Sequence, residues 1–216
     1  MAGMADSPED RTARARIRDA ALWHFGEHGF DRATIRGIAE TAGVSSGLVR
    51  HHFGSKEALR EACDAHLAEV LRQINERVRA DPMANGVNYV AVARAALGPH
   101  QRYLARALTE GGATALFDKM VELGQQWLTE DDARRADPPG TDTGTRAAVG
   151  TAMALSVLVL QQQLSRVLGI DITGTEGDRL LAGALIDIHS RPMLGTEEAA
   201  ALRSALGLDP AEQRRS

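Results

Sequence analysis

The chain has little of what defines disulfide-stabilised proteins or sheet proteins. It has a single cysteine, Cys63, so no disulfide can form within it, and we expect a reducing compartment, the cytoplasm. Aromatic residues make up only 4% of the 216 residues, while alanine and leucine abound, which favours helices over strands. No segment alternates between apolar and polar residues for long enough to predict a strand. The first residues lack the apolar centre of a signal peptide.

The longest uncharged stretch, residues 147–165, does not have the composition of a membrane span. It contains glycine, threonine, serine and three consecutive glutamines, Gln161 to Gln163. Glutamine is costly to place in lipid, and the apolar part is too short to cross a bilayer. We therefore expect no membrane contact, and a helix that is buried in the core or in an interface.

The chain carries more negative than positive charge overall, but its positive charge is concentrated near its beginning. The net charge of −4 alone argues mildly against nucleic-acid binding. Residues 1–60 nevertheless hold nine Lys or Arg against eight Asp or Glu, and the remaining residues hold sixteen against twenty-one. Four arginines fall between Arg11 and Arg18; this run is either a solvated helix face or a contact to a DNA backbone. The pattern is typical of a small DNA-binding head on an acidic body.

Apolar periodicity and helix-end signals predict an all-α protein. Glycines 29, 43 and 54 end the first three helices, and Thr34, Ser45 and Ser55 begin the next three. We predict a first helical domain over residues 9–54, a connecting helix over 55–80, and a larger helical domain over 81–216. The predicted helices span residues 10–28, 35–42, 46–53, 56–79, 86–97, 99–109, 112–130, 143–169, 176–190 and 196–206, with a loop over 129–144.

The segment from Thr34 to Lys56 has the spacing of a helix-turn-helix. Ala39 supplies the small side chain that two steeply crossing helices need, and Gly43, four residues later, fits a turn with positive φ. Val49, six residues further on, is expected to fill the shared core.

The outward face of the second short helix is suited to the major groove. Small residues at its beginning let the helix approach DNA closely, and Arg50 can reach a guanine edge. Lys56, at the start of the following helix, is expected to contact a phosphate with that helix's N-terminus. The candidate DNA-binding residues are Arg36, Ser45, Ser46, Gly47, Arg50, His51 and Lys56. The alternative is a helical bundle that does not bind DNA, but packing alone does not require these candidate residues on one exposed face.

These residues together resemble the TetR family over roughly Arg14 to Leu67. The matching pieces are Ala21-x3-Phe25, Gly29-Phe30, Thr34-Ile35, Ile38-Ala39, Ala42-Gly43-Val44-Ser45, Gly47, His52-Phe53 and Ser55-Lys56-Glu57-x-Leu59. The family often has two tyrosines where this chain has Arg50-His51, a departure expected to change the DNA sequence that is bound.

The resemblance implies that residues 9–54 are a helix-turn-helix DNA-binding domain and residues 81–216 a ligand-binding and dimerisation domain. It implies a dimer that binds a palindromic DNA operator and responds to a small-molecule effector, most often as a repressor; an activator is the alternative. The apolar helices near 143–169 and 176–190 are expected to form the homodimer interface. We expect no cofactor. Candidate effector-binding residues, each of which could instead be core or surface, are His100, Tyr103, Phe117, Met120, Trp127, Gln161 and Gln162.

A zinc hydrolase is the competing hypothesis from another class. Residues 24–28 read HFGEH, which matches the H-x-x-E-H pattern of inverted zinc peptidases. His24 and His28 would share a helix face and could both bind zinc, but a third ligand and a cleft are also needed. The alternative interpretation is two solvent-facing histidines.

Overall fold

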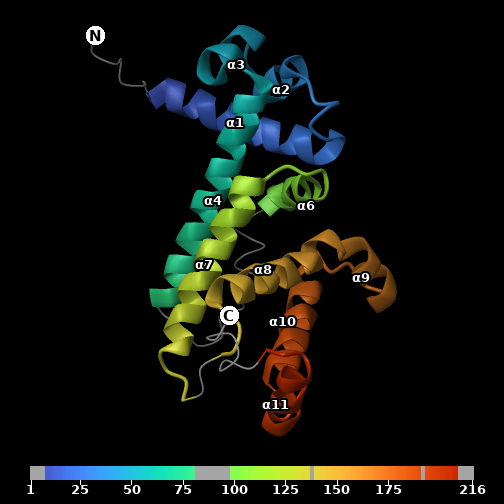
Figure 1. Ribbon diagram of the computed structural model, residues 1–216. Helices are drawn as coiled ribbons and strands as arrows, with labels where there is room; N and C mark the ends of the chain where they lie inside the picture. The colour runs from blue at the N-terminus through green and yellow to red at the C-terminus, as the bar shows by residue number, and fades with distance from the viewer. Residues whose placement is uncertain (1–7, 81–97, 137–138, 191–192, 209–216) are drawn as a thin grey trace, which may run out of the picture. The chain divides into compact units, whose positions relative to one another are not determined.

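The computed structural model describes residues 8–80, 98–136, 139–190 and 193–208, and within these ranges it contains helices and no strand (Figure 1). The predicted all-α fold is confirmed. The helix expected over residues 86–97 lies outside the described residues. The helices are α1 (Pro8–His28), α2 (Ile35–Ala42), α3 (Ser46–Phe53), α4 (Lys56–Ala80), the 3-10 helix η1 (Gly98–His100), α6 (Gln101–Thr109), α7 (Thr114–Asp132), α8 (Thr143–Val159), α9 (Gln161–Leu168), α10 (Thr175–Ser190) and α11 (Thr196–Ala205).

The helices fall into two compact units. The first unit holds α1 to α4, η1, α6 and the beginning of α7, and the second holds the rest of α7 and α8 to α11. The first unit extends past residue 80, the boundary that the sequence suggested, because α6 packs against α1.

The short helices of the first unit begin and end at the residues that the sequence indicated. The side-chain oxygens of Thr34, Ser45 and Ser55 accept hydrogen bonds of 3.1, 3.1 and 3.0 Å from the backbone N–H three residues later. Gly43, which ends α2, has a φ of +65°. A residue with a Cβ is strained in that conformation, so glycine is needed for the turn between α2 and α3.

The core of the first unit is built from the predicted apolar faces of four helices. Each helix contributes small or aliphatic residues at the spacing of one helix face, and α1 and α3 each add a phenylalanine. The buried residues are Ile17, Ala21 and Phe25 of α1, Ile38, Ala39 and Ala42 of α2, Val49 and Phe53 of α3, and Leu59, Cys63 and Leu67 of α4.

The loop between α1 and α2 is fixed by the side chain of Lys56. Its ammonium group donates hydrogen bonds to the carbonyl oxygens of Phe30, Asp31 and Ala33, at 2.9, 3.3 and 3.2 Å. The same group lies 4.4 Å from the centre of the Phe30 ring. An ammonium has three N–H donors, and here all three are directed at the loop. Lys56 therefore joins the beginning of α4 to the backbone that leads into α2.

Helix α6 is held against α1 and α4 by one glycine and one tyrosine. A Cβ on Gly26 of α1 would stand 3.0 Å from the backbone nitrogen of Tyr103, so the two helices approach closely only because residue 26 is glycine. The buried Tyr103 hydroxyl donates a hydrogen bond to the carboxylate of Asp64 on α4. Burial raises the pKa of Asp64, and the bond from Tyr103 acts in the opposite direction.

The second unit contains the largest difference from the predicted helices. Residues 143–169, predicted as one helix, form α8 and α9, which are bent by 62° at Leu160. Leu160 has φ −95° and ψ 16°, yet its N–H still bonds to the carbonyl of Ser156 at 2.8 Å. Among the described helices, none is by itself long and apolar enough to cross a membrane; α8 and α9 reach that length only as a bent pair.

Replacing Lys56 with methionine is expected to destabilise the fold. The substitution keeps the aliphatic stem but leaves three carbonyl groups of the loop without their donor, which costs about 1–3 kcal/mol of the free energy of unfolding. Urea unfolding followed by circular dichroism measures this loss. The matched control is Arg36→Met, because Arg36 is exposed and no ion pair involves it within the described residues. Equal stability of the two variants would contradict the anchoring role.

Tyr103→Phe is expected to lower stability in a pH-dependent way. Because burial raises the pKa of Asp64 in the folded state, its contribution to stability is full at low pH and is lost as the pH rises through the folded pKa. Loss of the phenol donor raises the folded pKa further, so the deficit of the variant should grow as the pH rises above the ordinary pKa of an aspartate, about 3.9. Urea unfolding at several pH values above this pKa, in a double-mutant cycle with Asp64→Asn, measures the coupling. A deficit that does not vary with pH would argue against it.

Candidate DNA-binding interface

Helix α3 is presented by the turn before it and by its own two buried residues. The N–H of Val44 in the turn bonds to the carbonyl of Ala39 at 2.9 Å, and the Ser45 side chain caps the new helix. Val49 and Phe53 are directed into the core. The opposite side of α3 is therefore left open, and Ser45, Gly47, Arg50 and His51 are exposed on it, with Ser46 half-buried.

Gly47 is not required for packing within the chain. A Cβ at this position would meet only the Ser45 hydroxyl oxygen, at 3.7 Å, which is ordinary van der Waals contact. Its φ is also not in the positive region, so the backbone would accept another residue. The absence of a side chain thus leaves the surface of α3 smooth without serving the fold.

Four exposed arginines lie on α3 or on the helices next to it. Arg36 is on α2 and Arg50 on α3, as predicted. Arg14 and Arg16 of α1 lie near the end of α3 and the turn before it: the Arg14 guanidinium is 5.2 Å from the centre of the Phe53 ring, and Arg16 Nη1 is 3.8 Å from where a Cβ on Gly43 would stand. The sequence showed the arginine run but not which members turn toward α3, because that depends on how α1 crosses the other two helices.

The two neighbouring histidines of α3 differ in environment. His51 is exposed, which leaves it free for its predicted DNA contact, and His52 is half-buried. The Nε2 atom of His52 is buried and has no hydrogen-bond partner within the described residues. The two rings are 5.5 Å apart and inclined by 65°, so they face different surroundings.

Lys56 is placed differently from the prediction. Its ammonium has three protein carbonyls as partners where the sequence suggested a DNA phosphate. We therefore leave Lys56 out of the DNA contacts proposed below and assign it the positioning of the loop before α2.

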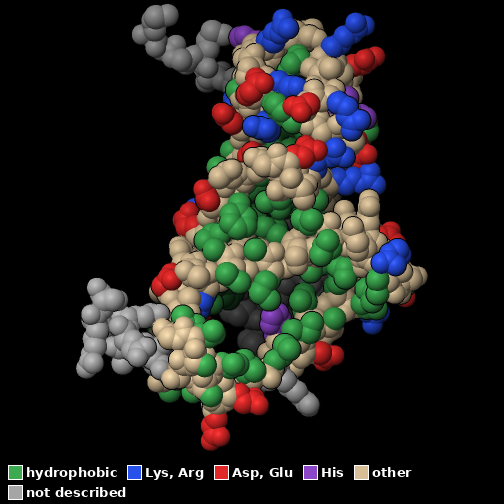
Figure 2. Space-filling model, turned by 45° about the vertical axis from the view of Figure 1, so that its right-hand side comes forward, with side chains coloured by type: hydrophobic (Ala, Val, Ile, Leu, Met, Phe, Trp, Pro, Cys, Tyr) green, Lys and Arg blue, Asp and Glu red, His purple; other side chains and the backbone are tan. Residues whose placement is uncertain are grey.

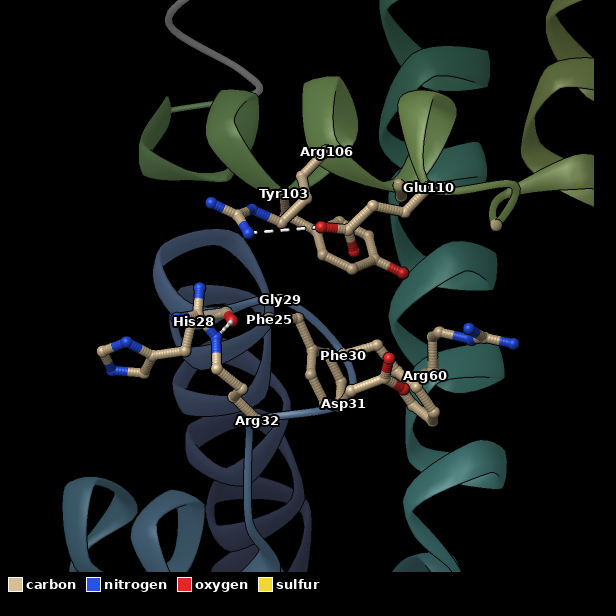
Figure 3. Close-up of a pocket in the computed structure, with 12 residues that line it drawn as sticks. Phe25, His28, Gly29, Phe30, Asp31, Arg32, Arg60, Tyr103, Arg106 and Glu110 are labelled. Carbon is tan, nitrogen blue, oxygen red and sulfur yellow. Dashed lines mark hydrogen bonds and ion pairs between the residues drawn. The ribbon is translucent and has the colours of Figure 1, made fainter.

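The seven candidate effector-binding residues are spread over both units. His100 and Tyr103 belong to the first unit, with Phe117 at the end of it on α7, while Met120, Trp127, Gln161 and Gln162 belong to the second. Tyr103 lines a hollow of about 510 Å³ in the first unit (Figure 3), and the other six are not among its lining residues. Trp127 and Gln162 are exposed, and the remaining five are half-buried or, in the case of Tyr103, buried.

The histidine pair that suggested zinc has other partners. His24 Nε2 lies 2.8 Å from the Thr41 hydroxyl oxygen, across the contact between α1 and α2. Burial, followed by the nearby His28, lowers the pKa of His24. Within the described ranges, no group of three or more His, Cys, Asp or Glu side chains is arranged to hold a metal ion. The geometry therefore gives the zinc hypothesis no third ligand.

Comparison with known proteins points to the same family as the motif between Thr34 and Lys56. Residues 17–63 match the family described as bacterial regulatory proteins, tetR family. The HTH-type transcriptional regulatory protein RaaS of Mycobacterium tuberculosis is 40% identical over 141 residues, which are 64% of this chain and 66%, just under two thirds, of that relative. The HTH-type transcriptional repressor Rv3405c of the same organism is 33% identical over 168 residues, 75% of this chain and 81% of the relative.

The fold agrees with this relationship. The structure of a TetR-family transcriptional regulator from Rhodococcus sp. superposes with a TM-score of 0.59 and 16% identity, covering 82% of this chain and 98% of that one. These relatives are named as regulators of transcription and not as enzymes. The chain belongs to the TetR family of bacterial transcriptional regulators.

Proposed function

We propose that this chain is a ligand-responsive repressor that binds a palindromic DNA operator as a homodimer in the cytoplasm. The observation that supports it most directly is the exposed side of α3. Small residues there allow close approach to base edges, and Arg50 is exposed beside them. Arg14, Arg16 and Arg36 are exposed on the two neighbouring helices and supply positive charge for phosphates.

The roles of the arginines follow from their positions. Arg50 lies on the helix that enters the groove, so we assign it a guanine edge. Arg14, Arg16 and Arg36 lie on the two helices beside it, where phosphate contacts fix register without reading sequence. His51, exposed next to Arg50, is assigned a further phosphate contact, and Ser45 and Ser46 are assigned contacts at the beginning of α3.

The homodimer is proposed to form through α8 and α10. Large apolar side chains on these helices are between 41% and 66% exposed in the single chain: Val149, Met153, Leu180, Ile186 and Ile188. Figure 2 shows hydrophobic side chains gathered on this face of the C-terminal unit. Monomeric proteins rarely leave so much apolar surface in water, and a second copy would cover it.

The effector is proposed to bind in the helical C-terminal unit. Met120, Trp127, Gln161 and Gln162 are the candidate side chains of this unit, which offer apolar surface and hydrogen-bonding groups. An effector that favours one arrangement of the dimer would change operator affinity, and the operator would change effector affinity by the same factor.

Selection of bound sequences from a random DNA pool by the full chain tests the proposed function. We expect an inverted repeat whose half-sites are about one helical turn apart, roughly 34–36 Å, because two α3 helices must enter successive major grooves on one face of the duplex. In the same selection, Arg50→Ala should lose preference at one base pair in each half-site and weaken binding to the selected operator by about 1–3 kcal/mol.

The control for Arg50→Ala is Arg166→Ala, which removes the same charge from an exposed position on α9. It should leave both the selected sequence and its affinity unchanged. A pool without any enriched motif would contradict sequence-specific binding, and an unaltered motif with Arg50→Ala would remove Arg50 as a base contact.

The substitutions Met153→Glu and Ile186→Glu are each expected to break the dimer. Each variant would place a charge in apolar surface that the partner covers, and burial of an unpaired carboxylate costs several kcal/mol. Sedimentation equilibrium at micromolar concentration should then give the mass of a monomer. The control is Gln163→Glu, which adds the same charge at an exposed polar position of α9. A wild-type monomer, or variants that stay dimeric, would contradict this interface.

A further inference from the structure

The hollow in the first unit shares no lining residue with the surface proposed for DNA or with the apolar faces proposed for the dimer. It is enclosed by the end of α1 and the loop after it, by α4, and by α6 with the turn that follows. All of its lining residues belong to the first unit. Its volume of about 510 Å³ is within the range of small-molecule sites in proteins.

One wall of the hollow is aromatic. The ring of Phe25 lies 5.5 Å from that of Phe30 and 6.1 Å from that of Tyr103, measured between ring centres. These three rings come from α1, the loop and α6, and Figure 3 shows them together beside the open space. Phe25 and Tyr103 are almost fully buried, so their positions are set by the core. Because Phe25 and Tyr103 expose almost no surface, a flat apolar group would contact the half-buried Phe30 and the Arg60 guanidinium, which lies 4.2 Å from the centre of the Phe30 ring.

Two guanidinium groups lie close to the backbone at the end of α1. Arg32 Nε donates to the carbonyl oxygen of His28 at 2.9 Å. Arg106 Nη1 lies 3.1 Å from the Cβ position of Gly29, the next residue. In Figure 3 both guanidinium groups lie on the same side of the hollow, opposite the ring of Phe30.

The local charge on this side is not fully balanced. Arg106 pairs with Glu110 at 3.2 Å, and both side chains are partly open to solvent. The hydrogen bond of Arg32 is made to a neutral carbonyl, which leaves its four terminal N–H donors for another acceptor. The lining holds three arginines, Arg32, Arg60 and Arg106, against two carboxylates, those of Asp31 and Glu110, so one further carboxylate would balance the charge.

Gly29 keeps this space open. It has a φ of +81°, and a Cβ there would also stand 3.3 Å from the Glu110 Oε1 atom. Any other residue would be strained and would press on the Arg106–Glu110 pair. The positive φ ends α1, and the missing side chain leaves room over the backbone between the arginines and the rings.

We propose that this hollow is a binding site for an aromatic carboxylate. The carboxylate lies between Arg32 and Arg106, and the ring packs over Gly29 against Phe30 and the Arg60 guanidinium. The loop that carries Phe30 and Arg32 is the one that Lys56 holds to α4, so an occupant stabilises the segment leading into α2. The proposal needs neither DNA binding nor dimer formation, and it stands or fails separately from them.

Isothermal titration of the full chain with 2-naphthoate tests the proposal, with 2-naphthamide as the uncharged ligand of the same shape. We expect one 2-naphthoate per chain and binding of the amide that is at least tenfold weaker, because the amide cannot replace the charge-assisted bonds. Arg32→Gln and Arg106→Gln should each weaken 2-naphthoate binding about tenfold or more. Arg102→Gln is the matched control, because Arg102 is one turn away on α6 and pairs with Glu27.

A second variant gives a result that misfolding cannot imitate. Glu110→Gln removes the carboxylate that competes for Arg106, so 2-naphthoate should bind several-fold more tightly than to the wild-type chain. The proposal is overturned if the wild-type chain does not bind 2-naphthoate, if the amide binds equally well, or if Arg32→Gln and Arg106→Gln bind as the wild type does. Weaker binding to Glu110→Gln would also overturn it.

Discussion

The position of α3 depends on the turn that joins it to α2, and that turn requires a residue with positive φ. A helix of eight residues is too short to be stable by itself, so its direction is fixed by what joins it to the rest of the unit. Gly43 provides that junction with its positive φ, and Ala39 lets α2 and α3 meet closely. With Val49 and Phe53 in the core, the other side of α3 has to face outward. The proposed DNA contacts all follow from this constraint.

The elements of the first unit could be predicted from the sequence because each of its signals is local. A serine or threonine cap acts within three residues, and a glycine at a helix end acts on its own φ. The bend at Leu160 has no such signal: neither glycine nor proline stands there, and the hydrogen bond from Leu160 to Ser156 continues across the corner. A periodicity of apolar residues does not record such a corner.

Contacts between side chains that are far apart in the sequence could not be predicted from the sequence. Lys56 was expected at a phosphate because it begins a helix, but its partners are carbonyls more than twenty residues earlier. Arg14 and Arg16 were visible only as members of a run. Whether such a residue points toward α3 or into solvent depends on how α1 crosses α2 and α3, which is a property of the assembled core.

The pairing of the cations is more informative about function than their number. Outside residues 9–54, several arginines have carboxylate partners. Arg72 hydrogen-bonds to Glu69 and lowers the pKa of Glu69 to about 2, and Arg146 bonds to Asp132. The four arginines around α3 have no such partner within the described residues. A paired guanidinium has to give up its carboxylate before it can bind a phosphate, whereas an unpaired one gives up only water. A chain with net charge −4 can therefore bind DNA, because the four arginines at the proposed interface need not leave a carboxylate in order to meet a phosphate.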